Sequence, residues 1–70
     1  MTNTELLKQE IESKGMKLTF IAEKIGISRD SLYRKINNKS AFNQYEIEDL
    51  CRLLGISSLK KKDEIFFAKV

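Results

Sequence analysis

The 70-residue sequence contains no histidine, no proline and a single cysteine, Cys51. Without histidine or a second cysteine, the usual zinc ligand sets and histidine-based acid–base chemistry are excluded, and no intrachain disulfide can form. No apolar run approaches the roughly 20 residues that span a bilayer. The N-terminal stretch Met1–Glu5 also lacks the basic start and apolar core of a secretory signal. We therefore expect a cytoplasmic protein without membrane contact, metal, cofactor or small-molecule ligand.

Other absences bear on organisation and catalysis. The lack of proline, low-complexity tracts and internal repeats gives no sign of a linker, so residues 1–70 are expected to form one domain around one small core. The sequence has neither a glycine-rich loop for phosphate nor a serine nucleophile elbow. An enzyme is therefore not expected.

The net charge is +3, and its distribution is more informative than its size. Residues 28–40 carry an excess of three positive charges, from Arg29, Arg34, Lys35 and Lys39 against Asp30. Residues 43–54 are instead locally acidic. A concentration of positive charge on one short segment is what phosphate binding requires.

Apolar residues at helical spacing predict four helices, near residues 4–14, 18–25, 29–37 and 43–54. Gly15, Gly26 and Gly55 are placed to end three of these helices in the left-handed conformation. Asn38 is suited to the same conformation after the third helix, because asparagine tolerates it better than most residues.

Capping residues are expected at the starts of the helices. Ser28 precedes the third helix as its N-cap, and Asn43 has capping-box spacing with Glu46 at the fourth. Thr2 and Glu5 have the same spacing at the first helix, which predicts Thr2 as its cap. Phe42 and Ile47 are spaced as a hydrophobic staple around the start of the fourth helix.

The tail, residues 58–70, is less regular. Ser58 is suited to cap a short turn through the lysines 60–62, and the apolar end Ile65–Val70 favours a short β-strand. This end is either the contact of a homodimer or a segment that closes over the core of the monomer. Both possibilities stay open at this point.

Residues 18–37 have the spacing of a helix-turn-helix motif. Ala22 is small where the two helices must approach closely, and Gly26 lies four residues later, where the chain reverses. Ile27 and Leu32 are apolar residues that fix the second helix of the pair across the first. This order leaves the outer face of the second helix free to enter a major groove.

The segment Ile21–Ser28 (IAEKIGIS), followed by Leu32 and Asn37-Asn38-Lys39, resembles the helix-turn-helix proteins of the phage Cro and repressor family, which have the lambda-repressor-like fold. The resemblance extends to about Ile56 through a capped helix that ends in Leu-Gly-Ile. It implies an all-α domain of four to five helices that binds double-stranded DNA, as a homodimer, to regulate transcription. The sequence departs from the family at Lys17 and Leu18, where a cap and a phosphate-binding glutamine are common.

The resemblance also implies which residues read bases. In the family these are the first two positions of the third helix and a position one turn further along, here Arg29, Asp30 and Arg34, with Tyr33 adjacent. Arginine suits guanine because its fork fits the O6 and N7 acceptors together. Asp30 has the alternative role of stabilising the helix N-terminus through the macrodipole, and Tyr33 that of half-burial against the preceding helix.

Phosphate contacts are expected around these base contacts. The family binds the DNA backbone with residues that follow the third helix. Hydroxyl or basic side chains near the two helix starts, and Lys35 on the third helix, complete the set. The candidates are Lys17, Ser28, Ser31, Lys35, Asn37, Asn38 and Lys39. Such contacts set position and affinity without carrying base identity. For each residue the alternative is an ordinary solvated side chain.

These observations leave two possible functions, one in DNA binding and one in protein binding. The leading prediction is a Cro- or repressor-like regulator that inserts its third helix into the major groove of operator DNA as a homodimer. The alternative is a protein–protein interaction module, such as the antitoxin half of a pair. The basic third helix favours DNA binding, since an acidic one would favour a protein partner.

Overall fold

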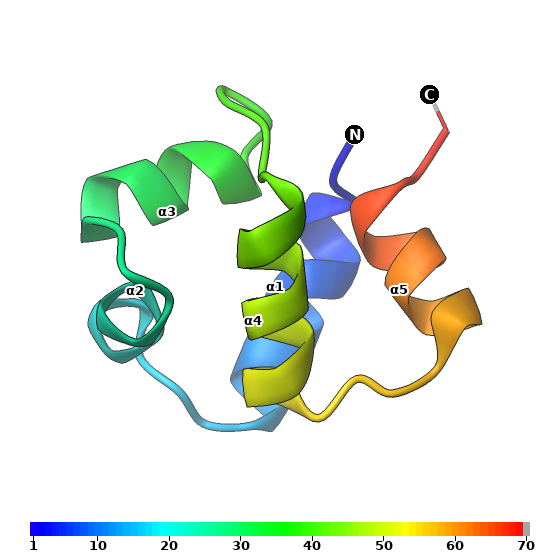
Figure 1. Cartoon of the computed structure of the whole chain (residues 1–70), viewed down its shortest axis with the longest axis horizontal. Helices are drawn as coiled ribbons and strands as arrows, with labels where there is room; N and C mark the ends of the chain where they lie inside the picture. The colour runs from blue at the N-terminus through cyan, green and yellow to red at the C-terminus, as the bar shows by residue number, and fades with distance from the viewer. Residues whose placement is uncertain (70) are drawn as a thin grey trace.

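The computed structural model describes residues 1–69, and within this range it contains five α-helices and no strand. The helices are α1 (Thr4–Ser13), α2 (Leu18–Ile25), α3 (Arg29–Ile36), α4 (Gln44–Leu54) and α5 (Leu59–Phe66). In Figure 1, α4 stands in front of α1 at the centre, with α2 and α3 on one side and α5 on the other. Within the described range, no helix combines the length and the apolar character needed to cross a membrane.

The all-α fold and the four helices expected between residues 4 and 54 are confirmed. Gly26 ends α2 with a φ of 81°, and Gly55 ends α4 with a φ of 70°. Asn38, which follows α3, has a φ of 62° and is the non-glycine residue with a positive φ in the described chain. The helices α2, α3 and α4 therefore stop where a residue tolerant of the left-handed conformation was expected.

The starts of α3 and α4 also agree with the prediction. The Ser28 Oγ accepts from the Ser31 N–H at 3.0 Å. The first helix differs, because its cap is Asn3 and not Thr2: the Asn3 Oδ1 accepts from the Leu6 N–H at 3.1 Å. The reason is that the Thr2 backbone is held elsewhere, by the side chain of Asn38.

One apolar core is drawn from all five helices and the short segment after α4. Its buried members are Leu7, Ile11, Ile21, Ala22, Ile25, Leu32, Ile36, Ile47, Leu50, Cys51, Leu54, Ile56, Ile65 and Phe66. Cys51 thus packs as a small apolar residue, and burial raises the pKa of its thiol.

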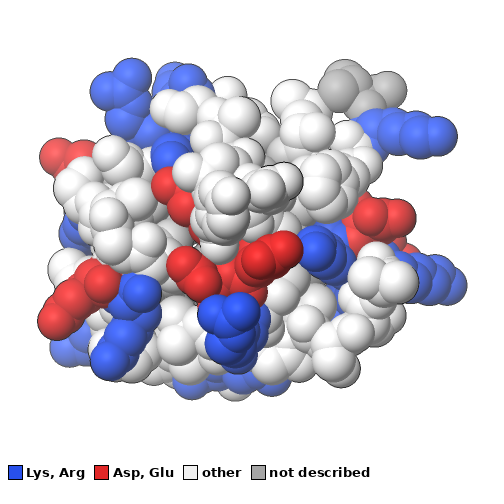
Figure 2. All heavy atoms as spheres, in the orientation of Figure 1, with Lys and Arg blue, Asp and Glu red and all other residues white. Residues whose placement is uncertain are grey.

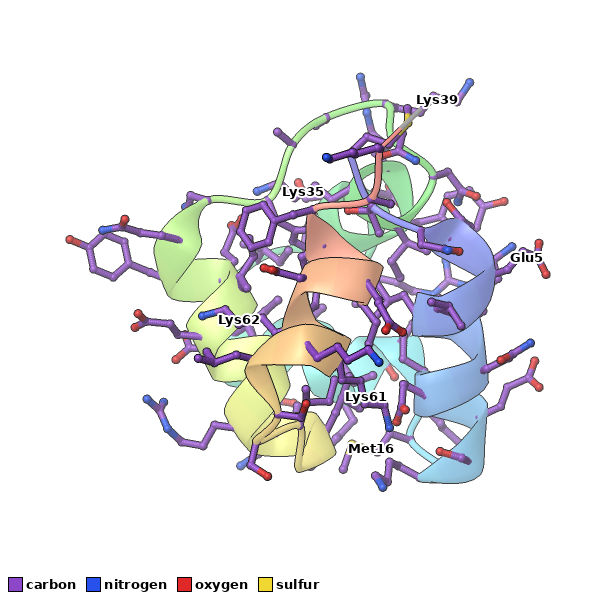
Figure 3. The ribbon with its side chains drawn as sticks, turned by 90° about the vertical axis from the view of Figure 1, so that its right-hand side faces the viewer. Glu5, Met16, Lys35, Lys39, Lys61 and Lys62 are labelled. Carbon is purple, nitrogen blue, oxygen red and sulfur yellow. The ribbon has the colours of Figure 1, made fainter. Side chains whose placement is uncertain are left out.

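The prediction of a short C-terminal strand is wrong. Ser58 does act as a cap, but it starts the full helix α5, with its Oγ accepting from the Lys61 N–H at 3.3 Å. Packing of α5 against α1, including an ion pair between Lys61 and Glu10, outweighs the β-propensity of the apolar end (Figure 3).

The position of α5 shows which residues of the tail close over the core and which stay exposed. Ile65 and Phe66 are buried in the core of the monomer, whereas Phe67 is 55% exposed. The last residue of the tail, Val70, lies outside the described residues. Closure over the core therefore holds for Ile65 and Phe66, and Phe67 alone of the described tail aromatics is available to a partner.

Residues 1–3 form an extended segment, here called the strap, that runs between α5 and the loop after α3. The Asn3 N–H donates to the Ile65 carbonyl at 2.6 Å, and the Ala68 N–H donates to the Met1 carbonyl at 2.9 Å. The two ends of the described chain therefore lie together, beside the loop that follows α3 (Figure 1).

Candidate nucleic-acid interface

α2 and α3 form a helix-turn-helix with a three-residue turn, residues 26–28. Leu32 is fully buried and Ala22 nearly so, which locks α3 across α2 through the apolar contact that the spacing predicted. The Gly26 N–H donates to the Ala22 carbonyl at 2.9 Å, and the Ile27 N–H donates to the same carbonyl at 3.0 Å. Backbone hydrogen bonds thus hold the turn, together with the Ser28 cap and the packing of Ile27 against the core.

The outer face of α3 carries the residues predicted to read bases. Arg29, Asp30, Tyr33 and Arg34 are all exposed. Within residues 1–69, no ion pair neutralises either guanidinium. Figure 2 shows basic side chains projecting from the upper edge of the molecule, where α3 and the loop after it lie. The charge on this edge is therefore free to meet an anion.

Tyr33 is half-buried, in agreement with one of the two roles expected of it. Its side chain lines an apolar crevice with Lys8, Leu18 and Ile36, yet about half of the residue stays exposed. The ring therefore lies at the edge of a crevice whose other walls come from α1 and α2, and part of it stays at the surface.

Several predicted phosphate ligands lie around this face. Lys39 is exposed at the tip of the loop after α3 (Figure 3). Lys17 is exposed at the start of α2 and makes no side-chain cap, so the first amide groups of α2 have no acceptor from that residue. Asn37 donates from Nδ2 to the Tyr33 carbonyl at 2.9 Å, and Ser28 and Ser31 are joined in the α3 cap.

Lys35 was predicted to bind phosphate, but in the structure its ammonium is paired with a carboxylate of the same chain. Its Nζ donates to both carboxylate oxygens of Glu46, at 2.8 and 2.7 Å, and the two side chains are only 18% and 8% exposed. Glu46 also closes the capping box of α4, since it accepts from the Asn43 N–H at 3.0 Å. Lys35 therefore ties α3 to the start of α4.

This shared carboxylate is stabilised in its ionised form. Burial raises the pKa of Glu46. The hydrogen bonds from Lys35 and from the Asn43 N–H, together with the charge of Lys35, lower this pKa by more than burial raises it. The net pKa lies below the ordinary value of 4.5. The ion pair is thus intact near neutral pH.

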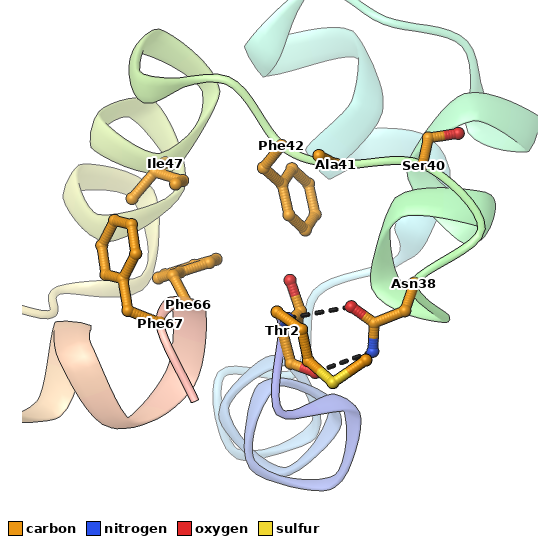
Figure 4. Close-up of a pocket in the computed structure, with 9 residues that line it drawn as sticks. Thr2, Asn38, Ser40, Ala41, Phe42, Ile47, Phe66 and Phe67 are labelled. Atoms are coloured by element: carbon orange, nitrogen blue, oxygen red, sulfur yellow. Dashed lines mark hydrogen bonds between the residues drawn. The ribbon is translucent and has the colours of Figure 1, made fainter. Parts of the chain in front are cut away.

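The side chain of Asn38 also bonds within the protein, to the backbone of Thr2. Its Oδ1 accepts from the Thr2 N–H at 2.9 Å, and its Nδ2 donates to the Thr2 carbonyl at 2.8 Å, as the dashed lines of Figure 4 show. Beside this pair, the Thr4 Oγ1 donates to the Ile36 carbonyl at 2.6 Å. The strap and the start of α1 therefore fix the C-terminal end of α3, and the amide of Asn38 is committed to that contact.

Sequence reasoning recognised Glu46 as a cap and Asn38 as a left-handed residue, but it assigned their partners incompletely. The contact between Lys35 and Glu46 spans 11 positions, and that between Thr2 and Asn38 spans 36. The sequence signal for the first contact was that Lys35 lies three residues after the core residue Leu32, where a lysine directed inward requires a nearby carboxylate.

A family model for the Cro/C1-type HTH DNA-binding domain matches residues 6–58. The chain belongs to this family. The match covers α2, α3 and α4 completely and most of α1, and it ends before α5 begins. No curated protein and no solved structure matches the chain. Family membership makes this Cro/C1-type domain a DNA-binding regulator, and it places the helix-turn-helix at residues 18–36 in the part of the domain that the family shares.

Proposed function

We propose that this Cro/C1-type domain is a sequence-specific transcriptional regulator that inserts α3 into the major groove of operator DNA as a homodimer. The observation that supports this best is the pair Arg29 and Arg34, exposed on the outer face of α3 with no acidic partner in the described chain. Arginines without a partner occur on many solvated helices, so the position of these two is what matters. Two unpaired ones on the protruding helix of this motif are suited to guanine edges.

The remaining side chains divide into reading and positioning roles. Tyr33 contacts a sugar, a thymine methyl or a phosphate next to Arg34. Asp30, in the first turn of α3, accepts from a cytosine amino group or favours the helix N-terminus through the macrodipole. Neither contact involves covalent chemistry, so the proposed activity is binding alone.

Phosphate binding is assigned to the exposed members of the predicted set. Lys39 in the loop after α3 and Lys17 at the start of α2 supply charge, and the uncapped amides at the start of α2 supply hydrogen-bond donors. Ser28, Ser31 and Asn37 add polar groups between them. Lys35 and Asn38 are assigned to the fold, because Glu46 and the strap occupy their polar groups.

A dimer follows from the size of the module. One small domain buries limited surface on DNA, whereas two copies that read half-sites roughly 34 Å apart gain both affinity and specificity. The operator is then expected to be near-palindromic, because a two-fold protein reads the two strands alike.

The deciding experiment is selection of DNA from a randomised duplex library by the purified chain at two salt concentrations. Enrichment of a near-palindromic site, with affinity that falls steeply as salt rises, is the expected result. Failure to enrich any sequence would overturn the proposal and favour the protein–protein module instead.

Arg34→Ala provides a residue-level prediction on the selected site. We expect the variant to lose about 1–3 kcal/mol of binding free energy on that site and to relax the preference at one base position, because the lost group is a base reader. Lys60→Ala, an exposed lysine of α5 remote from α3, is the matched control. Fluorescence anisotropy with the selected and a scrambled duplex measures both. An equal loss on the two duplexes would remove Arg34 from the base-reading set.

A further inference from the structure

The strap connects α5 to the loop that follows α3. On one side, Asn3 donates a backbone hydrogen bond to α5, and Met1 accepts one from the residues that follow α5. On the other side, the N–H and the carbonyl of Thr2 both bond to the side chain of Asn38. Thr2 is only 8% exposed, so water competes little for these two bonds.

The contact with the strap uses two separate properties of asparagine at position 38. The backbone of Asn38 has a φ of 62°, a conformation that asparagine adopts more readily than most residues. Its amide also accepts from the Thr2 N–H at 2.9 Å and donates to the Thr2 carbonyl at 2.8 Å (Figure 4). A glycine would suit this backbone and lose both bonds, whereas an aspartate would offer the Thr2 carbonyl no donor. Substitution by glycine therefore separates the attachment to the strap from the backbone conformation.

The residue after Asn38 is tied to α3 as well. The Lys39 N–H donates to the Arg34 carbonyl at 2.8 Å, and the Thr4 Oγ1 donates to the Ile36 carbonyl at 2.6 Å on the same turn. The backbone of Lys39 is therefore held from two directions, by the last turn of α3 and by the strap through the neighbouring Asn38.

This double attachment bears on the lysine at the tip of the loop. Lys39 is exposed, and it is a predicted phosphate ligand (Figure 3). When the backbone of a lysine is already fixed, binding an anion has to order only the rotamers of its side chain. If the loop itself had to be ordered first, the lost entropy would weaken the contact.

We propose that Asn38 is a positioning residue for DNA binding, which holds the loop after α3 against the strap so that Lys39 meets a phosphate. This inference rests on the proposed function, because it takes the DNA backbone as the ligand of Lys39. Asn38 itself makes no contact with DNA and acts through its neighbour. The strap and α5 both lie outside residues 6–58, so the support comes from parts of the chain beyond the matched family region.

A double-mutant cycle on DNA affinity tests this role. We expect Asn38→Gly to bind the selected and a scrambled duplex about three- to tenfold more weakly at about 0.1 M salt, because a phosphate contact carries no base identity. The dependence of log affinity on log salt concentration should become shallower by up to about one. In the Lys39→Ala background, Asn38→Gly should cause no further loss.

Two controls separate positioning from a general effect on the fold. Lys17→Ala removes a lysine at the start of α2, outside the loop, and in this background Asn38→Gly should cause its full loss. Circular dichroism at the temperature of the titrations should show Asn38→Gly folded as the wild type is, since glycine adopts the left-handed conformation freely.

The possible outcomes are distinct. Equal losses from Asn38→Gly with and without Lys39 would overturn the proposal, because the amide would then act independently of that lysine. Wild-type affinity in Asn38→Gly would also overturn it, since the loop would hold its position without the strap. In both cases the wild type still binds DNA and the proposed function stands. A wild type that binds neither duplex overturns the proposed function and the role of Asn38 together.

Discussion

At the scale of single residues, Glu46 has the most constrained environment in the described chain. Its carboxylate closes the capping box of α4, accepts two hydrogen bonds from the Lys35 ammonium and is buried, and the Lys35 side chain is itself only 18% exposed. Removal of either partner leaves a charge with little access to water, which costs more than the loss of an exposed pair. The junction of α3 and α4 therefore depends on the ionisation of this group.

The stability of the domain should depend on pH through Glu46. Its pKa in the folded protein lies below the unfolded value, so its contribution is fully present above about pH 4.5 and is lost as the pH falls through the folded pKa. Urea unfolding between about pH 7 and pH 3 measures this acid limb. Glu46→Gln should be less stable near neutral pH and show a shallower limb, whereas Glu48→Gln, on the exposed face of the same helix, serves as control. An unchanged limb in Glu46→Gln would contradict the assignment.

Local patterns predicted the backbone state of such residues better than their contacts. The asparagine at position 38 follows α3 at the expected left-handed turn, and its φ of 62° agrees with that prediction. Its bonds to Thr2 could not be predicted, because they depend on where the strap lies after folding. Lys35 illustrates the same limit, since no local period indicates a partner 11 positions away on another helix.

At the scale of secondary-structure elements, the turn between α2 and α3 sets the angle at which α3 leaves the surface. Gly26 has a φ of 81°, and a β-carbon added there would meet no atom within 4 Å. The requirement for glycine is therefore one of backbone conformation and not of space.

Gly26→Ala should destabilise the domain by about 1–2 kcal/mol, the cost of holding an L-residue in the left-handed conformation. Gly26→Asn should cost less, because asparagine tolerates this conformation. Urea unfolding of the two variants measures the difference. Wild-type stability in Gly26→Ala would mean that the turn can change its conformation without loss.

The element that sequence patterns described least well is α5. Ser58 was recognised as a cap, but the run Lys60–Lys62 hid the helical period and the apolar end resembled a strand. The stretch becomes a helix because Ile65 and Phe66 reach the core only when a helix from Leu59 places them on one face toward α1. Tertiary packing, which no local window contains, decides such short segments.

At the scale of the whole molecule, α5 completes the core although it lies outside the matched family region. Phe66 is 4% exposed and packs edge to face on Phe42 from the α3–α4 loop. The segment beyond the shared region therefore supports the loop that carries Lys39.

Phe66→Ala should remove about 3–5 kcal/mol of stability, the cost of truncating a buried phenylalanine. For a chain of this length the total is only about 4–10 kcal/mol, so the variant should be largely unfolded at moderate temperature. Phe67→Ala, its exposed neighbour, should unfold as the wild type does at dilutions where the chain is monomeric. Thermal unfolding followed by circular dichroism measures both. Equal stability of the two variants would contradict the placement of Phe66 in the core.

The hydrogen bonds that join Met1 to Ala68, and Thr2 to Asn38, have a consequence for local opening. Chain ends are usually the first parts of a domain to fray, and they do so independently. Met1 bonds to Ala68 and Thr2 bonds to Asn38, so detachment of residues 1–3 releases both the end of the chain at Ala68 and the loop after α3. We therefore expect residues 1–3, the end of α5 and the loop after α3 to exchange with solvent as one cooperative unit.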